Sequence, residues 1–549
     1  MGIGILEPKQ AVVPGTIQLF DSQLEEADTS HLKHSADGKT ILAPQPSDSP
    51  NDPLNWPLHK KDLIFLVVLF DSILSGIHGP MLAPVTVELA VEFNVSLTAS
   101  AQLGTYMLLL ISGIAYIDAA LANIYGKRAI FVVSMAILMA SDAWGARATS
   151  YNSLLGARML SGVGQAALEC LTASIVPDLY FVHQRSRRVM AFLLFSGSGV
   201  FLGVVIAGQI AAVASWRNIF IGLAVAEGVM LLMTFLFFHE PAYKREHVDP
   251  LAHLSGQAIA EKVEATEIHE VSATTPSALE SSHHPEQLKT FLQNLNLYQG
   301  RFSQNNLLHL LYRSFILTFH PTIFWAGTVT FLLAWSVGCS FTIAAFMIVP
   351  PYNFSTGAVG NMYLGPWIGL VIALLVGEPI FRWVAMKLTK LNQNIYEPEF
   401  RLFHIIPGVI LGIIGCVGWG WGEQNTISWG ALVFFFALIV AGAVLVNSGA
   451  INYILDAHRE FSNESQVILF AMKVWSLSDV NDLLEFFQLR YGLLFCRLVG
   501  ICRPEDRLEH RCGFIHCMCF GRSVCLLLRE ENARLLEPAQ IHGNPRSQT

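Results

Sequence analysis

Four polar side chains that could transfer protons or bind a small ligand interrupt the apolar runs of this sequence. Glu169 follows Gln165 by four residues, so both share one face of a helix. Asp71 and His78 are seven residues apart and share a face in the same way. Ionisable groups inside apolar segments are costly to bury and tend to be functional. We expect the four to line a substrate or proton pathway; hydrogen bonding between helices, or a structural polar pair, is the alternative.

Proton coupling needs a carboxylate whose protonation responds to solvent access and to bound substrate. Glu169 is our first candidate for that group and Asp71 the second. We add Tyr106 and Asn447 as further polar side chains of the same pathway. Glu378 is a weaker candidate, because it lies near the end of an apolar run, where its side chain can reach the water outside the membrane.

Motifs for enzymatic chemistry are missing from the sequence. It contains no P-loop, zinc-protease or nucleophile-elbow pattern, which argues against a nucleotide-driven pump and against an enzyme. Six of the nine cysteines follow residue 490, but Cys512, Cys517 and Cys519 with the neighbouring histidines match no standard zinc spacing. We therefore expect no catalytic residue, no metal and no cofactor.

Long apolar runs must position the candidate groups. Crossing a bilayer takes about 20 apolar residues in a helix, and most of the runs reach that length alone or with a flanking turn. The runs are Leu63–Leu82, Leu108–Ala122, Ala129–Ala143, Ala191–Ala214, Ile219–Phe238, Ile323–Val349, Ile368–Pro379, Ile405–Trp421 and Trp429–Val446. The sequence therefore predicts an all-α polytopic membrane protein with the lipid bilayer as its environment.

Composition supports this prediction. The 549 residues are 53% hydrophobic and 14% charged, whereas soluble proteins carry about 25% charged residues. A formal net charge of −8 without any basic block gives no support to a nucleic-acid partner. The first 60 residues are polar, so we expect the first span to insert without a cleaved leader.

The pattern of runs divides the chain into five parts. Residues 1–60 resemble a disordered cytoplasmic tail, and 61–240 contain six spans. Residues 241–320 are rich in Glu, Ser, Thr and His and predict a flexible cytoplasmic linker. Residues 321–475 hold a second bundle of four to five spans, and 476–549 form an aberrant tail. Two sets of spans around a linker favour a transporter with a midplane site between two halves.

Basic residues in the short loops predict that the amino terminus and the linker are cytoplasmic. Ten Lys or Arg lie in the loops of that side and two in the opposite loops. The ten are Lys127, Arg128, Arg185, Arg187, Arg188, Arg382, Lys387, Lys390, Arg401 and Arg459; the two are Arg147 and Arg217. Sequons at Asn94 and Asn353 fall outside in this orientation, so both are candidate glycosylation sites.

The loop between the second and third runs combines a glycine with two adjacent cations, which could hold one conformation of the helix bundle. It runs Ala119-Ala-Leu-Ala-Asn123-Ile-Tyr-Gly126-Lys127-Arg128, in which glycine permits a tight turn. Its two cations can pair with carboxylates and with helix carbonyl ends, holding one conformation. The alternative is a simple positively charged cytoplasmic turn.

This loop resembles the signature loop of the major facilitator superfamily, and further matches follow it. Residues 158–167, led by Arg158, resemble the fourth-span motif. Residues 178–185, from Asp178 to Arg185, resemble the loop after that span, and 216–220 the entry to the sixth. Residues 52–57, 350–355 and 396–402 resemble fungal members, nearest to a drug:proton antiporter-like branch. The resemblance covers roughly residues 50–473.

The resemblance implies the major facilitator fold, in which two pseudo-repeated six-helix bundles rock about a central cavity. It implies a proton-coupled transporter of a small organic molecule, acting as a monomer in the plasma membrane rather than the vacuole. It places Arg158 at the cavity and assigns conformational gating to Asn123, Gly126, Lys127, Arg128, Asp178 and Arg185. A transporter-like receptor or sensor, or a non-functional truncated transporter, remains the alternative.

Three departures from the family pattern stand out. Asn123 replaces the usual aspartate, so a charge relay through this position is weakened. Val204 replaces a proline typical of antiporters in the fifth span. After about Lys473 the chain turns polar and basic, and its longest apolar piece is interrupted by Arg497 and cannot cross a bilayer. We expect the second bundle to be incomplete at the carboxyl terminus, through a frameshift or a retained intron.

Overall fold

The computed structural model shows an all-helical protein. The structure describes residues 46–243, 306–330, 352–392, 395–457 and 462–478, with short pieces at 17–18, 33, 290, 293, 295–303 and 347–348. The predicted tail after residue 478, most of the linker and most of the predicted seventh span lie outside the described residues. Nine helices of the described part are long and apolar enough to cross a membrane. The predicted all-α polytopic fold class is therefore confirmed.

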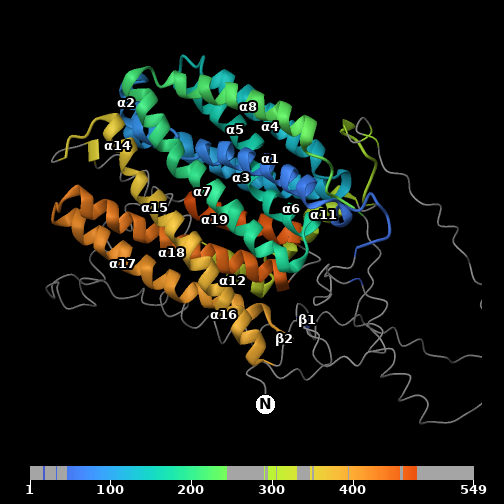
Figure 1. The fold of residues 1–549 in the computed structure, drawn as a ribbon. Coiled ribbons are helices and arrows are strands. Elements are labelled where there is room, and N and C mark those ends of the chain that lie inside the picture. Colours follow the sequence, from blue (N-terminus) through green and yellow to red (C-terminus); the bar gives the residue numbers. More distant parts are fainter. Residues whose placement is uncertain are drawn as a thin grey trace, which may run out of the picture.

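The helices before the linker form one group, here called the amino-terminal half (Figure 1). Its candidate spans run from Leu58 to Phe237 and number six. The elements are η1 (Pro53–Asn55), α1 (Leu58–His78), η2 (Ala83–Val85), α2 (Thr86–Glu92), α3 (Leu97–Tyr125), α4 (Arg128–Gly145), α5 (Tyr151–Cys170), α6 (Thr172–Leu179), α7 (Val182–Val213) and α8 (Arg217–Phe237).

The elements after the linker form the carboxyl-terminal half, which lies beside the first in Figure 1. Three further candidate spans lie between Thr356 and Ala457. The elements are α11 (Leu307–Leu317), α12 (Pro321–Val329), α14 (Thr356–Met362), α15 (Leu364–Ile372), the π-helical turn η3 (Ala373–Gly377), α16 (Glu378–Leu391), η4 (Pro398–His404), α17 (Ile405–Gln424), α18 (Trp429–Ala457) and α19 (Ser462–Ser478). Strands β1 (Ile17–Gln18) and β2 (Ile395–Tyr396) pair antiparallel.

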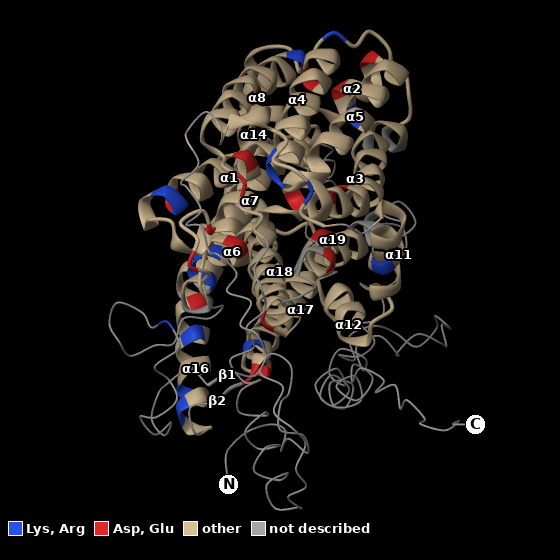
Figure 2. Ribbon diagram, turned by 90° about the vertical axis from the view of Figure 1, so that its right-hand side faces the viewer, with Lys and Arg blue, Asp and Glu red and all other residues tan. Residues whose placement is uncertain are grey.

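Helix ends follow the local sequence. Ser96 and Ser150 cap α3 and α5, because each hydroxyl accepts a hydrogen bond from the backbone N–H three residues on. The predicted fourth span is divided at Leu171 into α5 and α6. The predicted eighth span is longer than its apolar run and is divided into α14, α15, η3 and α16, with Lys and Arg gathered on α16 (Figure 2).

Small residues bring α5 close to its neighbours. A Cβ at Gly162 would lie 2.5 Å from the backbone oxygen of Met107 on α3, and one at Gly164 would lie 2.8 Å from that of Ser134 on α4. Helices in membranes associate largely through such close backbone contacts. The glycines of the fourth-span motif therefore place α5 between α3 and α4.

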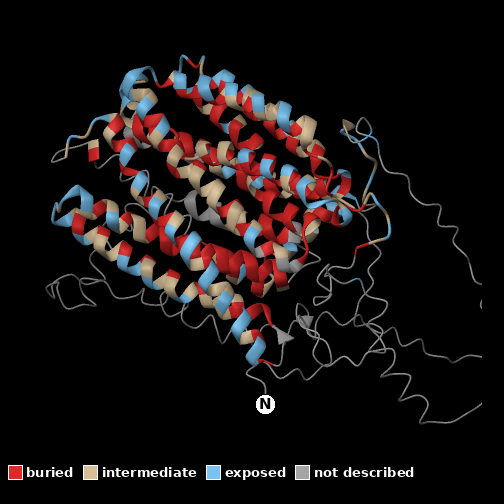
Figure 3. Ribbon diagram, in the orientation of Figure 1, coloured by how far each residue is buried: buried red, intermediate tan, exposed pale blue. Residues whose placement is uncertain are grey.

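The distribution of buried and exposed side chains fits a bilayer. Burial is concentrated where helices face one another (Figure 3). Large apolar side chains are exposed on outer faces, as at Val225, which is 65% exposed, and Val133, at 55%. An extended apolar surface marks a protein or membrane contact, and the span-length helices identify the contact here as lipid.

Candidate functional site

A cavity lies between the two halves. Its volume is about 140 Å³, whereas one water molecule needs only about 10–15 Å³, so the cavity has room for several water molecules. The amino-terminal wall is built by α1, α3, α5, α6 and α7 and the carboxyl-terminal wall by α15, α18 and α19. The polar lining residues are Gln165, Glu169, Ser196, Asn447 and Gln466, and the aromatic ones Phe192, Phe201 and Phe470.

Glu169 and Gln165 reach this cavity from one face of α5. Gln165 Nε2 donates to the backbone oxygen of Ser75 at 2.8 Å. Ser75 Oγ donates to Glu169 Oε1 at 3.2 Å. Glu169 is half-buried and is the one carboxylate among the described lining residues. The predicted pair therefore lies at the cavity and is held against the last turns of α1.

Asn447 faces the same cavity from the carboxyl-terminal half. It lies on α18 and is 7% exposed. Gln466 on α19 is a further lining residue of that half, and sequence reasoning did not select it. Both are amide side chains in apolar helices, so the same search for polar groups inside spans would have found Gln466.

The other pathway candidates lie outside the cavity lining. Asp71 is buried, and its Oδ2 accepts a hydrogen bond of 2.8 Å from Thr234 Oγ1 on α8. Tyr106 is 39% exposed on α3. Arg158 is fully buried, and its guanidinium donates to the backbone oxygens of His78 and Gly79 where α1 ends. A cation at a helix carboxyl terminus is favourable, so Arg158 caps α1.

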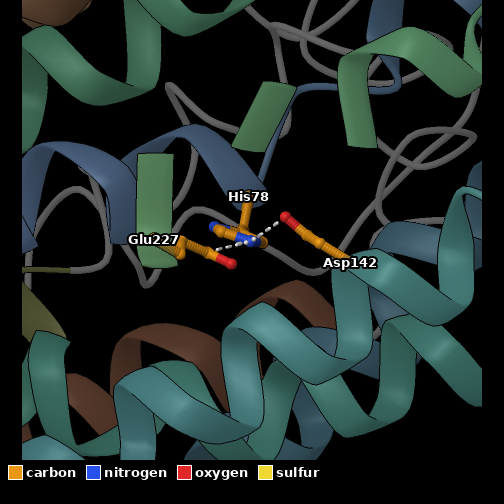
Figure 4. Close-up of side chains that lie close together, drawn as sticks. All are labelled: His78, Asp142 and Glu227. Atoms are coloured by element: carbon orange, nitrogen blue, oxygen red, sulfur yellow. Dashed lines mark hydrogen bonds and ion pairs between the residues drawn. The ribbon is translucent and has the colours of Figure 1, made fainter. Parts of the chain in front are cut away.

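His78 forms a buried cluster inside the amino-terminal half (Figure 4). Its Nε2 lies 3.2 Å from Asp142 Oδ2 on α4 and 3.0 Å from Glu227 Oε1 on α8. All three side chains are at most 1% exposed. Sequence reasoning missed Asp142 and Glu227, although each is a carboxylate in an apolar run, which is the signal that selected Asp71 and Glu169.

Glu240 anchors the turn between α3 and α4. Its carboxylate accepts the backbone N–H groups of Lys127 at 2.9 Å and Arg128 at 3.0 Å. Burial raises the pKa of Glu240, and the backbone N–H donors partly offset this effect. Gly126 has φ of 90°, and a Cβ there would collide with the carboxylate of Glu240. Glycine is therefore required at this turn, and Glu240 is a partner that the sequence did not reveal.

The two cations of the turn bind different neighbours. Lys127 Nζ donates to Asp178 Oδ2 at 2.6 Å and to the backbone oxygen of Ser174 at 2.8 Å. Arg128 donates to the backbone oxygens of Phe235 and Phe238 at the end of α8, at 2.7 and 2.9 Å. The turn is thus tied to α6 and α8 of its own half.

Arg185 and Asn123 complete the group of gating candidates. Arg185 donates to the backbone oxygens of Pro177 and Tyr180 and so closes the loop after α6. Asn123 Nδ2 donates to Glu464 Oε1 on α19 at 3.1 Å, and Arg313 on α11 pairs with the same oxygen. The contact between Asn123 and Glu464 joins the two halves at this end of the molecule, whereas the pair of Arg313 and Glu464 lies within the carboxyl-terminal half.

The glycosylation candidates Asn94 and Asn353 are exposed in loops, with φ of 52° and 48°. Asn94 follows α2 and Asn353 precedes α14. Asparagine tolerates the left-handed conformation better than most residues. Both side chains are accessible in this structure, and their glycosylation stays a prediction.

Sequence relatives of this chain are fungal transporters. An uncharacterized MFS-type transporter of Schizosaccharomyces pombe is 24% identical, with 83% of each chain covered. Protein HOL1 of Saccharomyces cerevisiae is 24% identical, covering 83% of this chain and 86% of that one. Multidrug transporter DTR1 of Candida glabrata is 24% identical, over 80% and 81% of the two chains.

A solved structure shares the fold. The proton:xylose symporter XylE matches with a TM-score of 0.50 and 12% identity, over 88% of this chain and 97% of that one. The family model described as Major Facilitator Superfamily matches residues 64–476. With its cavity between two helical halves, its signature loop and its fungal transporter relatives, this chain belongs to the Major Facilitator Superfamily, in a fungal drug-efflux-like branch.

Proposed function

We propose that this protein is a secondary active transporter that moves a small organic molecule across the membrane by alternating access, coupled to protons. Family membership supports the transport of a small substrate. The observation that supports the site most directly is the cavity between the halves, whose walls come from α5 and α7 on one side and α15, α18 and α19 on the other. A site between two halves can be opened to either side by rocking one half against the other.

Glu169 is the proposed coupling group. It is half-buried at the cavity wall and accepts a hydrogen bond from Ser75 on α1. A carboxylate in a space that alternates between water access and closure changes its affinity for protons with that access. Because Ser75 lies in the last turns of α1, the charge on Glu169 also affects how α1 is held.

The contacts of the substrate are proposed to be mainly apolar. Aromatic side chains from α7 and α19 provide area, and Gln165, Asn447 and Gln466 provide amide groups that fix orientation. Binding sites for small molecules commonly combine a largely apolar lining with a few placed polar groups. One relative is a multidrug transporter, which supports the proposal that this protein exports an organic compound.

The proposed gate lies at the end that carries the α3–α4 turn. Asn123 and Glu464 join α3 to α19, while Lys127, Arg128, Asp178 and Arg185 hold the turn to its own half. Opening at this end requires the Asn123–Glu464 contact to break while the contacts within the half persist. We propose that this end is cytoplasmic, that the chain acts as a monomer, and that it lies in the plasma membrane.

A growth screen identifies the substrate. A strain expressing the protein is compared with an empty-vector strain across toxic compounds and nutrients. Compounds that alter growth are then tested for flux in proteoliposomes with an imposed pH gradient. Flux that depends on the protein and the gradient supports the proposal, and a bound ligand without any flux contradicts it.

A further inference from the structure

The cluster of His78, Asp142 and Glu227 lies outside the cavity lining and contains carboxylate oxygens that have no hydrogen-bond partner among the described residues. Neither oxygen of Glu227 has a hydrogen-bond partner among the described residues, and Asp142 Oδ1 has none either. Glu227 is fully buried and lies with one oxygen 3.0 Å from His78 Nε2. A buried carboxylate whose oxygens lack partners costs several kcal/mol, and a bound cation or a proton would offset that cost.

The histidine is already oriented to bind one. His78 Nδ1 lies 2.9 Å from the backbone oxygen of Leu74, which can only accept, so Nδ1 carries a hydrogen. Nε2 therefore faces the carboxylates with a lone pair when the ring is neutral, or with one N–H when the ring is protonated. Histidine ligands of metals almost always donate the other ring N–H to a carbonyl or carboxylate in this way.

One proton on Nε2 does not satisfy both carboxylates. Nε2 is placed to hydrogen-bond Asp142 Oδ2 at 3.2 Å, whereas the close approach of Glu227 has no hydrogen-bond geometry. Asp142 also interacts electrostatically with Arg158. The acceptors without a partner are therefore the two Glu227 oxygens and Asp142 Oδ1, and a cation placed between the three residues would contact each of them.

Distances between the ligand atoms fit a small dication. One atom from each residue lies within 4.8 Å of the others, and the two separations from Nε2 are 3.0 and 3.2 Å. Zinc binds histidine nitrogen and carboxylate oxygen at about 2.0–2.2 Å, so tetrahedral ligands lie about 3.3–3.6 Å apart. The two carboxylates would have to move away from Nε2 by a few tenths of an ångström to admit an ion.

We propose that His78, Asp142 and Glu227 form a buried binding site for a first-row transition-metal dication, with Zn²⁺ as the probe. Imidazole with carboxylates is a ligand set that suits such metals. The ligands come from α1, α4 and α8, so the ion would join three helices of the amino-terminal half. Its role would be to keep this half rigid while the halves move, and it would take no part in substrate contact.

Elemental analysis tests the site. The full chain is expressed in zinc-supplemented medium, because the cluster is closed to solvent, and purified through a tag without histidine. We expect one Zn²⁺ per chain, and expression in cobalt-supplemented medium should give the visible bands of tetrahedral Co²⁺. Glu227→Gln keeps the size of the side chain and removes its charge, and it should abolish both signals. Loss of a residue that only hydrogen-bonds to a metal ligand costs about 10–100-fold in metal affinity, so loss of a ligand itself should cost more.

Asp118→Asn is the matched control, since Asp118 is a buried carboxylate on α3 of the same half but outside the cluster. It should retain the metal. His78→Gln and Asp142→Asn should lose it while eluting as monodisperse protein, which separates loss of the site from misfolding. The proposal would be overturned if wild-type protein contained no metal, or if Glu227→Gln contained as much metal per chain as wild type. The three side chains would then bind protons and no metal.

Discussion

Replacing Asn123 by aspartate should open the gate between the halves. In the structure, the amide of Asn123 donates to Glu464 Oε1 at 3.1 Å, and Glu464 is 3% exposed. Asn123→Asp replaces the donor with a second carboxylate at the same place. At an effective dielectric constant of about 20, two unit charges 3.1 Å apart repel by about 5 kcal/mol.

Part of this repulsion will be relieved. Side-chain relaxation separates the carboxylates, and Arg313, which pairs with Glu464, offsets some of the charge. If about 2 kcal/mol remains, the closed arrangement loses about 30-fold relative to the open one, since 1.4 kcal/mol corresponds to tenfold.

Cysteine labelling measures this shift. Ala120 on α3 is 1% exposed and packs with Leu310 of α11, so Ala120→Cys is covered while the gate is closed. In a background without other cysteines, a polar maleimide should label it about 30-fold faster in Asn123→Asp. Adding Glu464→Gln restores a carboxylate–amide pair and should return labelling to the slow rate. Unchanged labelling in Asn123→Asp, or no rescue in the double variant, would refute the gate.

Three further predictions follow from the turn, the orientation and the tail. Gly126→Ala should lower the melting temperature, because φ of 90° costs about 1–3 kcal/mol for other residues and the added Cβ would collide with Glu240. Gly222→Ala is the control and should leave the melting temperature unchanged, because a Cβ at Gly222 has no neighbour within 4 Å. Equal melting temperatures of the two variants would contradict the prediction. Protease added to sealed, right-side-out cells should leave the linker at 241–320 intact, and cleavage there would contradict the predicted cytoplasmic location of the linker. Translation of the genomic DNA past codon 473 in the other two frames should reveal two further apolar runs of span length. If neither frame encodes them, the frameshift hypothesis is wrong and the tail is genuine.

The all-helical membrane fold follows from the apolar runs because span length is a local property of sequence. Helix breaks follow less directly. The division at Leu171 has no proline or glycine within three residues to mark it, and the π-helical turn Ala373–Gly377 lies just before Pro379, which marks a break without giving its form. Residues 331–346 of the predicted seventh span lie outside the described part.

The candidate site was predictable where its members share one helix. Gln165 and Glu169 are four residues apart, so helical geometry alone puts both at the same wall. Pairs from distant helices could not be found in this way. His78 was paired with Asp71 on spacing, whereas the structure brings it to Asp142 and Glu227 on two other helices.

The proton-coupled uptake or efflux of a compound from the growth screen tests the central claim most directly. Proteoliposomes containing wild-type protein, Glu169→Gln or Glu88→Gln are given the same pH gradient; Glu88 is an exposed carboxylate on α2 and serves as the control. We predict that wild type and Glu88→Gln accumulate the compound with the gradient, and that Glu169→Gln loses this accumulation but keeps exchange without a gradient. Gradient-driven accumulation that is unchanged in Glu169→Gln would contradict the assignment of Glu169 as the coupling group.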